Sequence, residues 1–223
     1  MEGKNVILEQ QTNYPWDGDI TLRVTGNKAG EFTLCVRVPG WVRGQVVPSD
    51  LYKYADGIQL GYTITVNGSV VGGLATDGYY TITRKWKKGD IVQIHFDMQP
   101  RMVVANEQVA ADHGRVAFER GPLVYCAEQN DNQGANPLHI LMGKQPRWKV
   151  ETGYGIPNTE ADGKPFQVVS LTTDDAQLAD IDATGRMTVK DQHLRLIPYY
   201  AWNHRGKTCM SVWLAQQLST FDD

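Results

Sequence analysis

Carboxyl groups are the side chains of this sequence best suited to hydrolytic chemistry, because two of them facing across a bond can act as an acid and a base. The candidates are Asp17, Asp19, Asp56, Asp77, Glu107, Asp112, Glu119, Glu128, Asp174 and Asp175. Most fall in turn sequences, where Asp commonly accepts hydrogen bonds from backbone amides. None is distinguished by its neighbours, so the sequence predicts no catalytic residue in this chain.

Metal-ligating and nucleophilic residues are scattered along the chain. The five histidines are His95, His113, His139, His193 and His204, with no pair at the spacing of a helical metal site. The three cysteines, Cys35, Cys126 and Cys209, lie far apart inside apolar runs. This pattern predicts small buried side chains and not a zinc site or a reactive thiolate. We therefore expect no metal and no cofactor in this chain.

Aromatic residues near loops and strand ends form a third group that could contact a ligand or a partner. They are Tyr14, Trp16, Trp41 and Trp202, together with His204 beside the last of them. Exposed rings of this kind stack on the apolar faces of sugars, as in carbohydrate-binding modules. They also close the ends of β-sandwiches or pack on a neighbouring domain. The sequence leaves the glycan and the domain-interface interpretations open.

The elements that must position these residues are strands, because apolar residues recur with a period of two. The alternation runs through residues 20–25, 32–38, 62–66, 80–83, 92–97, 194–196 and 210–214. Asn67-Gly68 between two such runs predicts a hairpin with a type I′ turn. Helix is expected only as single turns, at residues 174–178 and 48–54. The pattern predicts an all-β chain with two packed antiparallel β-sandwiches and little helix.

Composition and charge narrow the classes of function. The 223 residues carry a net charge of −3 and are 41% hydrophobic and 21% charged, as in a globular protein that buries a core. This charge balance argues against nucleic acid as a partner, because nucleic-acid binders need a basic surface. No apolar run approaches the roughly 20 residues of a membrane helix. No secretion signal is recognisable after Met1.

An ordered set of short motifs resembles the C-terminal part of glycoside hydrolase family 127. This is the β-L-arabinofuranosidase family, first catalogued as a domain of unknown function. The motifs are Tyr14-Pro15-Trp16-Asp17-Gly18, Val36-Arg37-Val38-Pro39-Gly40-Trp41, Val66-Asn67-Gly68, Gly78-Tyr79-Tyr80, Trp86-Lys87-Lys88-Gly89-Asp90, the run from Gly114 to Tyr125, the run from Leu196 to Gly206, Met210 and Val212-Trp213-Leu214. Each motif alone is weak, but their order and spacing together are specific.

The resemblance implies a division of labour in a larger protein. Members of the family carry an N-terminal (α/α)6 catalytic barrel followed by two β-sandwiches, the first jelly-roll-like. On that pattern residues 1–105 plus 208–223 form the first sandwich and residues 106–207 the second. The family's cysteine nucleophile, its zinc ion and a ligating glutamate belong to the barrel, and no stretch of this chain matches their motif. The chain alone is thus predicted to be inactive.

Several partners follow from the same resemblance. The leading interpretation is a pair of sandwiches that support the catalytic barrel and mediate dimerisation. The alternative is a carbohydrate-binding module that contacts plant-type glycans through its loop aromatics. The substrate sugar is not readable from this part of the protein, and a periplasmic or secreted location rests on analogy only.

Overall fold

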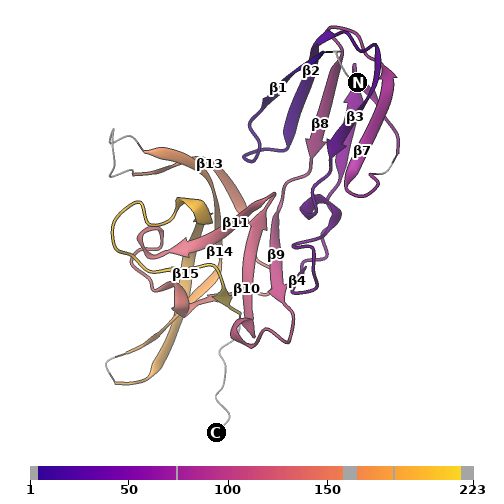
Figure 1. Ribbon diagram of the computed structural model, residues 1–223. Helices are drawn as coiled ribbons and strands as arrows, with labels where there is room; N and C mark the ends of the chain where they lie inside the picture. The colour runs from indigo at the N-terminus through magenta and orange to yellow at the C-terminus, as the bar shows by residue number, and fades with distance from the viewer. Residues whose placement is uncertain (1–4, 74, 158–164, 183, 217–223) are drawn as a thin grey trace. The chain divides into compact units, whose positions relative to one another are not determined.

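The computed structural model describes residues 5–73, 75–157, 165–182 and 184–216, and it divides the chain into two units (Figure 1). The first unit comprises Met1–Pro48 and Ile58–Gln99, and the second comprises Ser49–Gly57 and Pro100–Asp223. The regular elements of the described residues are strands and single turns of 3-10 helix. The prediction of an all-β chain with little helix is confirmed.

The first unit forms two antiparallel sheets. One sheet has the order β1 (Val6–Thr12), β2 (Asp19–Asn27), β8 (Ile91–Phe96), β5 (Tyr62–Val66) and β6 (Ser69–Val70), and the other pairs β3 (Glu31–Arg37) with β7 (Tyr79–Lys85). Alternate residues of both sheets point into one shared core, as the period-two pattern requires. This unit is therefore a β-sandwich.

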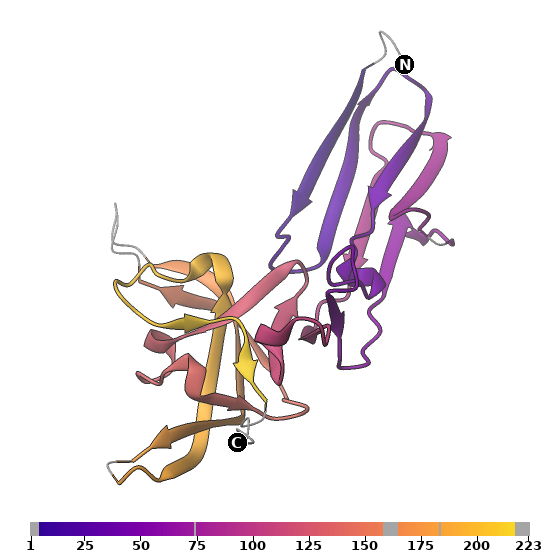
Figure 2. The same cartoon turned by 60° about the horizontal axis from the view of Figure 1, so that its bottom comes forward.

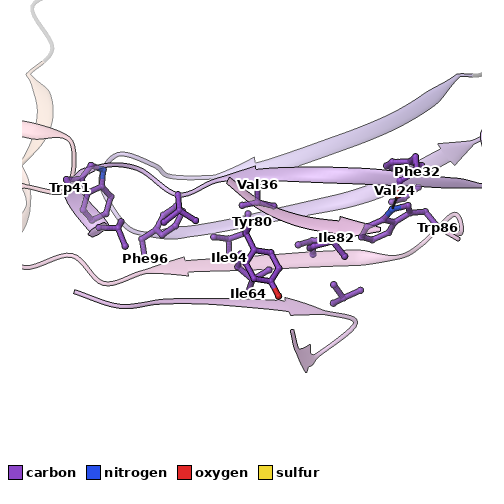
Figure 3. Packing of buried hydrophobic residues seen from close by; sticks show 14 residues of the cluster. Val24, Phe32, Val36, Trp41, Ile64, Tyr80, Ile82, Trp86, Ile94 and Phe96 are labelled. Carbon is purple, nitrogen blue, oxygen red and sulfur yellow. Dashed lines mark hydrogen bonds between the residues drawn. The ribbon is translucent and has the colours of Figure 1, made fainter. Parts of the chain in front are cut away.

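The core of the first unit is bounded at its two ends by tryptophans (Figure 3). At one end Trp41 meets the edge of Phe96, with 5.9 Å between ring centroids. At the other end Trp86 stacks on Phe32 and donates a hydrogen bond of 3.0 Å from its indole nitrogen to the Phe32 carbonyl. Tyr80 lies between these ends, beside Ile64 (Figure 3).

The predicted hairpin at Asn67-Gly68 is confirmed. Both residues have positive φ, 51° and 81°, as a type I′ turn requires, and the turn joins β5 to β6. Asp77-Gly78 adopts the same geometry, with φ of 52° and 78°, just before β7. Asn, Asp and Gly tolerate these angles better than other residues, which explains the Asn-Gly and Asp-Gly pairs at the two turns.

The second unit is built from one continuous sheet. Its strands are β4 (Tyr52–Tyr54), β9 (Pro100–Ala105), β10 (Arg115–Arg120), β11 (Leu123–Glu128), β12 (Ile140–Met142), β13 (Lys149–Ile156), β14 (Phe166–Ile181), β15 (Met187–Pro198), β16 (Met210–Ser211) and β17 (Leu214–Ala215). The pairings β10–β11–β15–β14–β12–β17–β10 close a circuit. The second unit is thus a single sheet that curls back on itself.

The closed circuit of strands surrounds the main core of the second unit. Phe118, Tyr125, Leu171 and Leu196 are fully buried there, together with Leu214. A smaller cluster comprises Cys126, Ile156, Val168, Ile197 and Ala201. Neighbouring residues of β11 and β15 enter different clusters because successive side chains of a strand point to opposite faces.

The unit boundaries differ from the predicted division at residues 105 and 208. Strand β9 pairs with β10 and β4, so residues 100–105 belong to the second unit. At the other end β16 pairs with β11, and β17 pairs with β10 and β12. Residues 208–215 therefore complete the second unit and not the first. Backbone hydrogen bonding decides this, and strands of two residues carry no periodic signal that reveals it.

Helical structure is confined to short 3-10 turns. They are η1 (Trp41–Arg43), η2 (Ala110–Asp112), η3 (Gln129–Asp131), η4 (Pro137–His139) and η5 (Tyr199–Ala201). The helical turn expected at residues 174–178 is wrong, because these residues lie within β14 around an irregularity in its register. The described residues contain no helix of the length and apolarity needed to span a membrane.

Candidate functional site

The aromatic candidates of the first unit are mostly used in its packing. Trp41 is only 7% exposed, and its indole N–H donates to the Tyr14 hydroxyl at 3.4 Å. Burial raises the pKa of Tyr14 above its usual value. Trp16 is 36% exposed and lies in the same loop as Tyr14. Trp41 is too deeply buried to present its face to a sugar, and it is in direct contact with Tyr14.

Gly18 ends the loop that carries Tyr14 and Trp16 and precedes β2. A β-carbon on Gly18 would lie 2.0 Å from the carbonyl oxygen of Phe96, so no other residue fits without moving the backbone. The Phe96 amide donates back to the Gly18 carbonyl at 3.0 Å. This contact explains why the motif ends in glycine and fixes the loop against β8.

The aromatic candidates of the second unit lie beside its smaller core. Trp202 is half-buried against the cluster that contains Cys126 and Ile197. His204 is exposed, and its ring meets the edge of Phe166 at 5.0 Å. These two candidates share one region of the second unit, but they flank a packed core and form no open aromatic platform.

Three of the candidate carboxylates, Glu128, Asp56 and Glu119, take part in two largely buried networks. The first network joins Glu128, Asp131 and Arg205, and the side chains of both carboxylates are 0% exposed. Arg205 donates to both carboxylates, with a bond of 2.6 Å from Nη1 to Oδ1 of Asp131. Tyr154 donates to Asp131 at 2.6 Å, and the Asn203 amide donates to Glu128 at 3.2 Å. One arginine serves both carboxylates, and the two carboxylates have no access to a substrate.

Arg195 extends this network towards the surface. Its guanidinium lies 4.2 Å from the centre of the Tyr154 ring and donates to Glu151 at 2.7 Å and to Ser170 at 2.6 Å. Asn132, which is fully buried, accepts from the Arg195 amide at 2.9 Å. Sequence analysis missed this set, because its members come from four separate strands and turns.

The second network attaches the segment Ser49–Gly57 to the second unit. Asp56 accepts from Nε of Arg101 at 2.9 Å, and the guanidinium of Arg101 lies 3.9 Å from the centre of the Tyr54 ring. The Tyr54 hydroxyl donates to Glu119 at 2.9 Å. Burial raises the pKa of Glu119, and burial with the nearby Glu119 charge raises that of Tyr54. The two carboxylates of this network have different partners, Arg101 for Asp56 and Tyr54 for Glu119.

The cysteines do not assemble a nucleophilic site. Cys126 is fully buried, and burial, together with the negative charges of Glu128 and Asp131, raises its pKa to about 12. Such a thiol is protonated at neutral pH and is therefore a poor nucleophile. Cys35 and Cys209 are exposed, so the prediction that all three are buried is wrong for these two. Within the described residues, no group of three or more His, Cys, Asp and Glu side chains could hold a metal ion.

Two clefts lined by described residues are large enough for a small ligand. The first, here called the Tyr62 cleft, lies in the first unit and encloses about 460 Å³. The second, the His193 cleft, lies in the second unit and encloses about 410 Å³. The His193 cleft is lined by Arg147, Lys149, Glu151, Thr172, Thr173, Asp174, Asp175 and His193.

The charged groups of the His193 cleft are paired with one another. Arg147 binds Asp175 at 2.8 Å and holds the pKa of that carboxyl at about 2. His193 binds Asp174 at 2.6 Å. The two aspartates lie where β14 shifts register against β15, and such irregularities re-aim side chains. Asp174 is paired with His193 and Asp175 with Arg147, so each carboxylate already has a basic partner within the cleft.

Comparison with known families identifies the class of protein. Residues 1–98 match the family model described as beta-L-arabinofuranosidase, GH127 middle domain, and residues 100–215 match the one described as glycoside hydrolase family 127 C-terminal domain. Both descriptions place the chain among glycoside hydrolases, and their boundary coincides with that between the two units. The chain belongs to glycoside hydrolase family 127.

Relatives of known structure or function support this assignment. A solved GH127 β-arabinofuranosidase is 50% identical, with a TM-score of 0.88 over 98% of this chain. A GH127 β-L-arabinofuranosidase from Geobacillus stearothermophilus T6 is 32% identical, with a TM-score of 0.77 over 97% of the chain. A non-reducing end β-L-arabinofuranosidase of Bifidobacterium longum subsp. longum is 32% identical over 90% of the chain.

The relatives are much longer than this chain. The chain covers 33% of the first structure, 31% of the second and 29% of the Bifidobacterium protein. It therefore corresponds to part of a family 127 protein, namely the regions named as the middle and C-terminal domains.

Proposed function

We propose that this chain is the non-catalytic β-sandwich region of a β-L-arabinofuranosidase-like enzyme and supports a catalytic barrel. The observation that carries the proposal is its match to the middle and C-terminal domain models, over about a third of the length of its relatives. Zinc and the catalytic residues belong, on this proposal, to the barrel. Dimerisation, a jelly-roll topology of the first sandwich and a periplasmic or secreted location remain expectations from the resemblance.

The chemistry of the described residues supports a non-catalytic role. The side chains of Glu128 and Asp131 are fully buried and share one cation, Arg205. Glu119 accepts a hydrogen bond from the Tyr54 hydroxyl at 2.9 Å, and the buried Cys126 is protonated at neutral pH. None of these groups combines exposure with a second reactive group, which hydrolysis by paired carboxyls or by a thiolate requires.

An apolar surface on the hairpin of β14 and β15 is our candidate for the contact with the barrel. The distal ends of the two strands project from the rest of the second unit in both views (Figures 1 and 2). Ile181 pairs with Met187, and Val189 lies on the same face of the hairpin. These side chains are 70%, 51% and 45% exposed, which favours a covering partner. The surface replaces Trp41, which is buried, as the candidate interface.

Two measurements test this proposal. The purified chain, supplied with zinc and a reductant, should not hydrolyse an aryl β-L-arabinofuranoside, and turnover would refute the non-catalytic role. The catalytic region of the 50% identical relative, produced separately, should bind the chain in analytical ultracentrifugation. Ile181→Lys should weaken that binding and Thr188→Lys, on the opposite face of the hairpin, should not. Absence of binding by the unaltered chain would contradict the supporting role.

A further inference from the structure

The Tyr62 cleft lies within the first unit, between β5, η1, β7 and the residues that follow β6. Its lining combines apolar, aromatic and polar side chains. The residues are Val42, Arg43, Gln59, Leu60, Gly61, Tyr62, Thr63, Ile64, Val70, Val71, Gly73 and Tyr80. Ligand sites typically enclose roughly 300–1,000 Å³ and combine an apolar lining with a few polar groups. With about 460 Å³, the cleft fits that description.

Hydrogen bonds fix the wall of this cleft. The Tyr80 hydroxyl donates to the carbonyl of Gly72, and the amide of Ala75 donates to the Tyr62 hydroxyl at 3.0 Å. The Val71 amide donates to the carbonyl of Ile64 at 3.0 Å. Two tyrosines thus hold the chain after β6 in place, so the cleft exists before any ligand arrives.

Gly73 lets the chain after β6 pass close to the ring of Tyr80. Its φ of +131° is rarely adopted by residues other than glycine, and a β-carbon there would lie 3.3–3.6 Å from atoms of Tyr80. The backbone therefore approaches the aromatic ring closely.

The polar groups at the cleft keep free hydrogen-bonding capacity. Arg43 is exposed and, among the described residues, forms no ion pair. Its guanidinium offers five N–H donors in a fixed plane. Gln59 is exposed as well and can both donate and accept. Below them lie the buried apolar residues Val42 and Ile64.

We propose that the Tyr62 cleft is a non-catalytic binding site for one sugar residue of an arabinofuranosyl glycan. A sugar has apolar C–H faces that suit the tyrosine and aliphatic lining, and hydroxyl edges that suit Arg43 and Gln59. The choice of arabinofuranose rests on the proposed function, since the relatives are described as β-L-arabinofuranosidases. The site would hold a glycan near a catalytic barrel without taking part in hydrolysis.

The test is a titration of the chain with a β-L-arabinofuranosyl disaccharide, followed by backbone-amide NMR. Signals of residues around Tyr62 and Val42 should shift in a saturable way. Arg43→Ala should weaken binding roughly 10- to 100-fold, because hydrogen bonds from a charged group are lost. Arg186→Ala, which removes another exposed arginine without an ion pair, should leave the affinity unchanged. Both variants should melt at the temperature of the unaltered chain.

The other outcomes overturn the proposal. One is that the NMR signals show no saturable shift up to high millimolar sugar, or that the shifts are confined to residues outside the cleft. Another is that the Arg43→Ala variant binds the disaccharide with the affinity of the unaltered chain. The last is that the chain binds galacturonate but not the neutral disaccharide. Failure here is distinguishable from failure of the supporting role. Association with the catalytic region, measured separately, would persist if only the glycan site were wrong.

Discussion

Replacing Arg205 by methionine should strongly destabilise the second unit. The side chain is 13% exposed and bridges Glu128 and Asp131, whose side chains are 0% exposed. Without it each carboxylate keeps one donor, the Asn203 amide for Glu128 and the Tyr154 hydroxyl for Asp131. Two buried negative charges would then lack a cation. Removing one partner of a buried ion pair costs about 3–5 kcal/mol.

That cost is a large share of the total stability of a domain, which is roughly 5–15 kcal/mol. For a unit of this size it corresponds to a fall in melting temperature on the order of 10–20 °C. Calorimetry with amide NMR during heating would assign the loss to the second unit, because the first has its own core. The matched control is Arg147→Met, which removes an 88% exposed arginine from its pair with Asp175 and should change little.

The expectation is wrong if Arg205→Met melts at the same temperature as the unaltered chain. It is also wrong if Arg147→Met lowers the melting temperature as much as Arg205→Met does. In the first case the carboxylates would have to be stabilised by water or by protonation. In the second, the loss would reflect the removal of any arginine and not the burial of this one.

Three further changes test single contacts. Gly18→Ala should destabilise the first unit, seen as a lower melting temperature, because its β-carbon would lie 2.0 Å from the Phe96 carbonyl; an unchanged melt would contradict the close approach. Burial raises the pKa of Glu119, so its contribution to stability is greatest below the usual glutamate pKa of about 4.3 and falls as pH rises through the raised value. Glu119→Gln should reduce the pH dependence of the free energy of unfolding, measured by denaturant titrations at several pH values. An unchanged pH dependence would contradict the raised pKa of Glu119. Cys35 should react with a thiol reagent in the native chain while Cys126, buried with a pKa of about 12, should react only on unfolding.

The strands of the first unit could be predicted from sequence because their faces differ in polarity. In β3, Phe32 and Val36 are buried and the alternate Thr33 and Cys35 are exposed. The same alternation places Cys35 on the outward face of β3. For this residue it is a better guide than the general tendency of cysteine to be buried. The turn at Asn67-Gly68 was equally predictable, since few residue pairs tolerate two positive φ angles.

The second unit was less predictable because long-range contacts assemble it. Strand β4 joins it through pairing with β9 and through the bond of Asp56 to Arg101, 45 residues away in sequence. Strands β16 and β17 have two residues each, and their partners are set by hydrogen bonds across the sheet. The Arg205 network likewise joins residues about 75 positions apart. No local pattern in the sequence predicts pairings between residues this far apart.

The buried network at Arg205 is better explained by positioning than by stability. Replacing a complete buried ion network by apolar side chains of similar volume is often neutral or stabilising, so its presence is not accounted for by folding energy alone. Its structural effect is local: Glu128 accepts the amide of Asn203, whose φ of 68° is uncommon for a residue other than glycine. The combined change of Glu128 and Asp131 to leucine and Arg205 to methionine should then restore much of the stability lost in Arg205→Met. Amide exchange of residues 199–206 should nevertheless become faster, because the turn at Asn203 loses its acceptor. Slow exchange in the restored variant would show that apolar packing suffices to hold this turn.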